Sequence, residues 1–254
     1  MMGKRRSIPM KHIFAVQNQT ELLAYQSFLE KHRGKLEQYL TFLQDRYAVT
    51  QLPRAVVWAD LETATFLISD LPIPAYTNEY RTVFCPEIPI WKSIYLRQLE
   101  QFSNAEIREY YEKELSVNHI LQILGHEFVH HSDLFLDDFD GLPDSGIWFE
   151  EGLCEYISRK YFLTDSEFNR QAQINALLVE NFRQRYDAPS LEEFGTATYQ
   201  EDYAAIFFQY WRSFLAVQKI VEGFSGDVQA VFRSYHRWDR CGREKPLEEW
   251  FAVR

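Results

Sequence analysis

Apolar positions recur every three or four residues near the start of the chain. In the segment Thr20–Tyr47, His32 fills one turn and the apolar positions are Leu22, Tyr25, Leu29, Leu36, Tyr39, Leu43 and Tyr47. This spacing places the side chains on one face and predicts an amphipathic helix, or a pair of helices broken at Gly34. A coiled coil would use the same rhythm, but the segment is short, so we expect the helix to pack on its own domain.

Short β-type runs follow between Leu52 and Leu96. They are bounded by prolines, and they cover Arg54–Ala59, Thr63–Ser69, Arg81–Phe84 and Ser93–Leu96. Runs of this kind between turn residues predict a small sheet. From Asn104 onward the pattern is helical, with predicted breaks at Asp137–Gly146, Asp187–Ser190, Gly195–Thr198 and Gly223–Gly226.

The order helix, sheet, helices predicts an α+β fold. The chain has no internal repeat and no Gly/Ser linker, so no boundary for an independent second domain is visible. We therefore expect a single unit over residues 1–254, with a helical segment at 1–50, a small sheet at 51–100 and a helical lobe at 101–254.

Composition narrows the class of protein. Hydrophobic residues make up 46% of the chain and aromatic residues 16%, which favours a globular protein with an aromatic core. The net charge is −10, and no long basic run follows Lys4-Arg5-Arg6, so a nucleic-acid partner is not expected. Three cysteines, far apart, imply no disulfide framework.

The sequence predicts neither a signal peptide nor a membrane span. Ser7 to Gln19 lacks an apolar stretch of the length that a signal needs, so we expect a cytoplasmic protein. The most apolar segment, Tyr203–Val217, is shorter than the roughly 20 apolar residues of a membrane helix. We expect it to be a buried helix.

The first candidate for chemistry is the motif HEFVH within residues 117–133, VNHILQILGHEFVHHSD. Helical spacing places His126 and His130 one above the other, so that two imidazoles can bind one Zn²⁺ while Glu127 reaches a water molecule as general base. Catalytic zinc needs three protein ligands and an open position. A third ligand must therefore come from elsewhere.

The segment Trp148–Tyr156, WFEEGLCEY, resembles the W-[LF]-x-E-G-x-x-x-Y stretch of gluzincin peptidases. Aminopeptidase-N-like enzymes and bacterial peptidase-MA-like proteins carry this stretch, and their Glu before Gly is the third zinc ligand. The resemblance implies that Glu151 has this role, with a slightly longer loop after the second histidine. It also implies a zincin-like fold, with the active-site helix between a sheet lobe and a helical lobe.

The same resemblance implies supporting residues. Thermolysin-like sites carry a carboxylate four residues after the ligand Glu, where it accepts the second N–H of a zinc-bound histidine; Glu155 holds that position. Glu150 is a weaker candidate, and an exposed helix charge is the alternative for both. The run TATYQEDYAAIFFQYW resembles the segment in which a Tyr faces the zinc. This makes Tyr199 the expected oxyanion donor, with Tyr203, His119 and His236 as alternatives.

Several neighbouring patterns narrow the assignment. Leu136 stands where metzincins have their third histidine, which excludes that subclass, and His131 is expected to be a surface or supporting residue. The G-x-M-E-N signature of aminopeptidases is absent. A substrate-pairing edge strand at Arg81–Cys85 or Ser93–Leu96 would fit endopeptidase action. Cys154 is expected to be a small core residue.

Acidic residues crowd the stretch from Ser132 to Ser158, which contains no Lys or Arg. This stretch would attract basic or amine groups of a substrate or bind Ca²⁺, or it is simply a solvated acidic loop.

The sequence therefore predicts a zinc-dependent hydrolase, most simply a peptidase acting on a peptide or protein, with no membrane or nucleic-acid partner. The alternative is a zincin-fold binding or regulatory module without catalysis. The sequence gives no oligomeric state.

Overall fold

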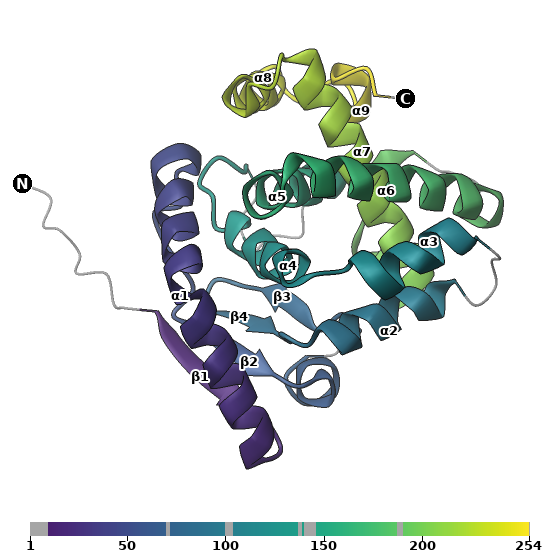
Figure 1. Ribbon diagram of the computed structural model, residues 1–254. Coiled ribbons are helices and arrows are strands. Elements are labelled where there is room, and N and C mark those ends of the chain that lie inside the picture. Colours follow the sequence, from purple (N-terminus) through teal and green to yellow (C-terminus); the bar gives the residue numbers. More distant parts are fainter. Residues whose placement is uncertain are drawn as a thin grey trace, which may run out of the picture. The chain divides into compact units, whose positions relative to one another are not determined.

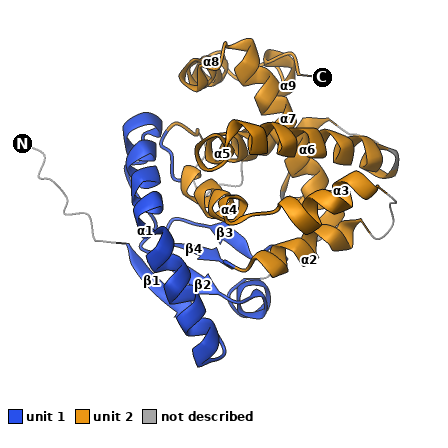
Figure 2. Ribbon diagram, viewed as in Figure 1, with its two compact units in different colours: residues 1–86, 131–133 blue, residues 87–130, 134–254 orange. Residues whose placement is uncertain are grey.

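The computed structural model describes residues 10–69, 72–99, 104–136, 139, 146–186 and 190–253. The chain forms two compact units, which Figure 2 distinguishes by colour. Unit 1 comprises Met1–Pro86 and His131–Asp133, and unit 2 comprises Glu87–His130 and Leu134–Arg254. The expected organisation as one unit with three segments stays a prediction.

Unit 1 contains a four-stranded sheet in the order β1-β2-β4-β3 (Figure 1), whose strands are β1 (Lys11–Ala15), β2 (Ala55–Ala59), β3 (Ala75–Thr77) and β4 (Arg81–Phe84). Strands β1, β2 and β4 are parallel, and β3 pairs antiparallel with β4. Two parallel neighbours need a long crossover between them. The helix α1 (Gln19–Tyr47) supplies it between β1 and β2.

The predicted N-terminal helix is confirmed, and it is not broken at Gly34. Asn18 caps α1 by accepting from the Glu21 N–H, and the helix ends at Ala48, which has φ of 50°. The buried face is the predicted one, comprising Tyr25, Leu29, Leu36, Tyr39 and Leu43. One exposed glycine costs a helix only about 1 kcal/mol relative to alanine, which is too little to break 29 helical residues.

The predicted β-runs Arg54–Ala59 and Arg81–Phe84 are strands, but two other predictions were wrong. Thr63–Leu67 forms a short π-helical turn, because Asp60 accepts hydrogen bonds from the Thr63 N–H and hydroxyl and so starts a helical path. Ser93–Leu96 lies within the helix α2 (Ile88–Gln98). Its buried residues Trp91 and Ile94 are three apart, which is a helical and not a strand period.

The two edge strands, β1 and β3, were not expected from the sequence. Strand β1 has only five residues and β3 only three, so neither shows a clear two-residue alternation. The prediction that Arg81–Cys85 or Ser93–Leu96 is an edge strand able to pair with a substrate was therefore also wrong. Strand β4 lies between β2 and β3 and has no free edge, and Ser93–Leu96 is helical.

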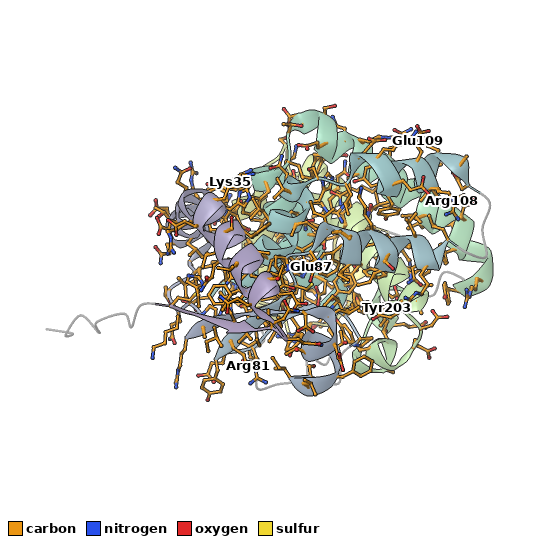
Figure 3. All side chains as sticks on the ribbon, turned by 60° about the horizontal axis from the view of Figure 1, so that its bottom comes forward. Lys35, Arg81, Glu87, Arg108, Glu109 and Tyr203 are labelled. Carbon is orange, nitrogen blue, oxygen red and sulfur yellow. The ribbon has the colours of Figure 1, made fainter. Side chains whose placement is uncertain are left out.

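Unit 2 is helical within the described residues (Figure 1). Besides α2 it contains α3 (Ala105–Glu109), α4 (Val117–Val129), α5 (Ile147–Phe162), α6 (Asp165–Tyr186), α7 (Tyr203–Gly223), α8 (Val228–Arg240) and α9 (Leu247–Trp250). Helix α5 packs against both α4 and α7, and α6 also packs against α7. Arg108 and Glu109 are exposed on α3 (Figure 3). The helices and the small sheet together confirm the α+β class.

The breaks between these helices agree with the sequence where they are described. The chain turns at Gly223–Gly226, and Thr196–Gln200 forms a short 3₁₀ helix. Most of Asp137–Gly146 and of Asp187–Ser190 lies outside the described residues. The segment Tyr203–Val217 lies within α7 as predicted, and no helix in the described ranges is long and apolar enough to span a bilayer.

Candidate metal centre

The HEFVH motif lies at the end of α4. This helix begins at Ser116, whose backbone N–H donates to His119 Nδ1 at 3.1 Å. His126 and Glu127 occupy its last helical turn, and His130 is its C-terminal cap residue. His126 and Glu127 are buried, at 4% and 6% exposure. The motif is therefore part of the packed interior of unit 2.

The third candidate ligand comes from α5. This helix follows Gly146, whose φ of 91° favours glycine, and its first turn carries the fully buried Trp148 and Phe149. Glu151 lies one turn further on. At the next position, a Cβ added to Gly152 would lie 2.5 Å from the Ser213 carbonyl oxygen of α7. The glycine of the E-G pair thus permits the close packing of α5 on α7.

His126, His130 and Glu151 come together with one donor atom each, all within 4.8 Å of one another. The two Nε2 atoms are 3.1 Å apart, and Glu151 Oε2 lies 3.0 Å from His126 Nε2 and 3.5 Å from His130 Nε2. Three ligands at tetrahedral zinc distances would lie roughly 3.3 Å apart. Glu151 Oε2 is buried and accepts no hydrogen bond, as expected of an atom that serves a cation. The donor set therefore fits a metal ion.

Carboxylates lie against the outward nitrogen of each histidine. Glu155 Oε1 is 3.2 Å from His126 Nδ1, a contact at ion-pair distance although not aligned as a hydrogen bond. Glu150 Oε1 is 2.8 Å from His130 Nδ1. The side chains of Glu155 and Glu150 are only 14% and 21% exposed, so neither is an exposed helix charge.

Arg159 and Gln122 hold the other oxygen of Glu155. Arg159 Nε donates to Glu155 Oε2 at 2.6 Å, and Gln122 Nε2 donates to the same oxygen at 3.2 Å. Burial by itself would raise the pKa of Glu155, but the charge of Arg159 and the nearby His126 outweigh it and lower the pKa to about 2. Glu155 is therefore a charged acceptor at neutral pH.

The buried carboxylates of the cluster favour a positive charge at its centre. Burial disfavours a charged His126, yet the neighbouring Glu151 and Glu155 outweigh this and raise the pKa of His126 to about 9. The histidines in turn hold the pKa of Glu151 below its usual range, against the effect of burial. Burial raises the pKa of Glu127 to about 7. A divalent cation would replace the protons that these groups otherwise hold.

Of the two expected tyrosines, the structure brings one to the cluster. Tyr199 donates to Glu151 Oε1 at 3.0 Å. The Tyr203 ring instead stacks on Phe207, with centroids 6.3 Å apart. It is half-buried at the first position of α7 and is marked in Figure 3.

The remaining histidines have other partners. His119 Nε2 lies 3.1 Å from the Tyr110 hydroxyl, and His236 Nε2 is 2.9 Å from the Leu134 carbonyl oxygen. His131 belongs to unit 1, where its Nε2 lies 2.9 Å from Thr77 Oγ1. It is buried at 7% exposure and is not a surface residue, because Thr77 of β3 pairs with it.

Tyr210 and Arg159 were not expected at the site, and Cys154, which was expected to be a small core residue, also lies close to it. The Tyr210 hydroxyl is 3.0 Å from that of Tyr199, and its ring centroid is 6.0 Å from that of His126. Arg159 pairs with Glu155 as described above, and the fully buried Cys154 thiol contacts His130. Burial raises the pKa of Cys154, so the thiol stays neutral. Tyr210 looks like a packing residue until its helix is placed, whereas the four-residue step from Glu155 to Arg159 is a sequence signal for an ion pair.

Two largely buried histidines and a glutamate, with a second carboxylate against each histidine, are an arrangement typical of the metal site of a hydrolase. Residues 100–247, more than half of the chain, match the collagenase family, peptidase M9. The chain belongs to this family of zinc metallopeptidases. Searches of curated proteins and of solved structures gave no match.

Proposed function

We propose that the protein is a zinc-dependent peptidase of the gluzincin type, with a zincin-like fold, and that His126, His130 and Glu151 hold the zinc. The observation that carries this is the convergence of three donor atoms on one point, with the buried Glu151 Oε2 left without a hydrogen-bond donor. Membership of a peptidase family supports a peptide or protein as substrate. The cytoplasmic location and the absence of a nucleic-acid partner stay predictions from the sequence.

The spacing within α4 supports Glu127 as the general base. It follows the ligand His126 directly, so it projects about 100° around the helix axis, beside and not into the ligand set. A zinc ion held here would supply Lewis-acid activation of water and of the peptide carbonyl. Glu127 would take a proton from the attacking water as its oxygen bonds to the carbonyl carbon, and would return that proton to the amine nitrogen as the C–N bond breaks.

For the oxyanion donor we propose Tyr199, with Tyr203 as the alternative. The Tyr199 hydroxyl lies one hydrogen bond from a proposed ligand, which supports a place beside the reacting carbonyl. Tyr210 shares a hydrogen bond with it and extends the hydroxyl pair. In the structure the Tyr199 hydroxyl donates its hydrogen bond to Glu151 Oε1, so donation to an oxyanion requires an exchange of that bond.

Metal analysis of the purified full chain tests the site. We expect about one zinc per chain in wild type, and loss of that zinc in both His130→Ala and Glu151→Ala, because two protein ligands bind zinc far less tightly than three. The matched control is His32→Ala, a histidine on α1 that packs against Phe28. It should keep its zinc. Unchanged zinc content in both ligand variants would contradict the assignment.

A peptide-library digestion separates the peptidase from a zincin-fold binding or regulatory module. Wild type should cleave some members of a mixed library, and mass spectrometry would identify the products. A wild type that holds zinc but cleaves nothing would favour the binding module.

A further inference from the structure

Arg159 is a buried cation close to the proposed metal centre. It is 4% exposed, and it lies on α5 one helical turn after Glu155. Burying a charge is costly unless a partner of opposite charge compensates it. The compensating partner is Glu155, whose Oε2 lies 2.6 Å from both Nε and Nη2 of Arg159.

The two oxygens of Glu155 have separate partners. Oε2 accepts from Arg159 and also from Gln122, which lies one turn before His126 on α4 and donates to Ser158 as well. Oε1 is left toward His126 Nδ1, at 3.2 Å. Arg159 and Gln122 therefore determine which way the carboxylate faces.

The aromatic ring of Phe214 lies under the guanidinium of Arg159. The Arg159 Cζ atom is 3.9 Å from the centre of this ring, which belongs to α7. An arginine on an aromatic face keeps its plane fixed, and the ring shields the ion pair from water. The orientation of Glu155 is thus anchored on both α5 and α7.

We propose that Arg159 is a positioning residue for the zinc ligand His126 and that it acts through Glu155. A histidine that binds zinc through Nε2 carries its proton on Nδ1, and an acceptor there fixes the tautomer and the ring plane. Arg159 keeps Glu155 in place as that acceptor. This inference rests on the proposed function, because it needs zinc at His126.

The test compares zinc release to a chelator from the zinc-loaded full chain in four variants: Arg159→Met, Arg159→Lys, Glu155→Gln and the double variant Arg159→Met/Glu155→Gln. Loss of such a supporting partner typically lowers metal affinity by about 10–100-fold. We expect release to be roughly 10-fold faster in Arg159→Met. The double variant should release zinc no faster than Glu155→Gln alone, because Arg159 acts through Glu155.

Two further measurements separate positioning from general loosening of the fold. Arg170→Met is the matched control, because Arg170 also bridges carboxylates, those of Glu106 and Glu114, but away from the cluster. It should lower the melting temperature without changing zinc release. The visible spectrum of the cobalt-substituted protein, which reports ligand geometry, should change in Arg159→Met and not in Arg170→Met.

The outcomes that would overturn the inference are distinct. Wild-type release in Arg159→Met, or an equal effect of this change with and without Glu155, would overturn the role of Arg159 and leave the zinc site standing. If Arg159→Met does not fold, Arg159→Lys decides, because lysine keeps the charge but loses the two-nitrogen contact with Glu155. Zinc release and a cobalt spectrum equal to wild type in Arg159→Lys would also overturn the role of Arg159. A wild type without zinc would overturn both this inference and the proposed function.

Discussion

Tyr199 donates a hydrogen bond to Glu151 Oε1 at 3.0 Å, while Glu151 Oε2 faces His126 and His130. One carboxylate thus connects a phenol to the proposed ligand set. The contact gives Tyr199 two possible tasks, which are to hold Glu151 in position and to stabilise the oxyanion of the reaction. Loss of the hydroxyl would lower zinc content in the first case and kcat in the second.

Tyr199→Phe distinguishes these tasks. If the phenol stabilises the oxyanion, its removal should lower kcat by roughly 10²–10³, with KM little changed and zinc retained, because the interaction forms only in the transition state. Steady-state kinetics on a peptide substrate and metal analysis measure this. Zinc loss together with activity would instead assign Tyr199 to the positioning of Glu151.

Tyr203→Phe is the control, because it removes a hydroxyl of the same kind at a residue that stacks on Phe207. We expect its kcat to stay within a few-fold of wild type. Full kcat in Tyr199→Phe together with a large loss in Tyr203→Phe would move the oxyanion role to Tyr203.

Glu127→Gln should abolish peptide cleavage while zinc content stays at the wild-type level. The amide has nearly the shape of the carboxyl but cannot take a proton from water, and Glu127 is not among the three donor atoms of the cluster. Product analysis by mass spectrometry and metal analysis on the same preparation test both halves. Retained cleavage would mean that another group is the base.

Much of the site was predictable because it depends on local helical periodicity. The four-residue spacing of His126 and His130 needs only that α4 be a helix, and the four-residue step from Glu151 to Glu155 needs only α5. The resemblance to gluzincins then predicted that Glu151 of α5 joins the two histidines of α4 at one metal ion. Long apolar rhythms in α1, α4 and α7 were visible for the same reason.

What the sequence did not predict depends on contacts between distant segments. Tyr210 meets the Tyr199 hydroxyl and the His126 ring only through tertiary packing, and its local sequence resembles that of a core residue. Glu155 and Arg159 are four residues apart on α5, a spacing that allows an ion pair, but only the packed structure shows that this pair is buried beside His126. Strands β1 and β3 are short and owe their conformation to pairing with β2 and β4. Such pairing is a tertiary effect that propensity over three to five residues does not reveal.

His119 should make stability depend on pH below neutrality. It is 2% exposed, its Nδ1 accepts from the Ser116 N–H, and burial lowers its pKa to about 4 from the usual 6.5. The unfolded chain takes up this proton near pH 6.5, whereas the folded chain does so only near pH 4. The stabilisation is therefore complete above pH 6.5 and is lost as the pH falls toward 4, by roughly 3 kcal/mol at most.

Urea unfolding of wild type and His119→Gln at a series of pH values measures this effect. The variant should be less stable at pH 7 because two hydrogen bonds of His119 change, to the Tyr110 hydroxyl and from the Ser116 N–H. The difference in the free energy of unfolding between wild type and variant should shrink as the pH falls from 6.5 to 4. A difference that is the same at every pH would show that His119 does not titrate on unfolding.

Gly152→Ala should destabilise the protein and disturb the metal centre. The added Cβ would lie 2.5 Å from the Ser213 carbonyl oxygen and from a Val217 methyl group, which is closer than atoms can approach. Helix α5 must then move away from α7, at a cost of roughly 1–3 kcal/mol for an overpacked contact. Glu151 is the preceding residue, so the same movement should displace it and weaken zinc binding.

The matched control is Gly34→Ala on α1, where a Cβ meets nothing within 4 Å. That change should leave zinc release unaltered and stabilise the helix by about 0.5–1 kcal/mol. Thermal unfolding and zinc release to a chelator measure both variants, and equal behaviour of the two would contradict the close approach of α5 and α7 at Gly152.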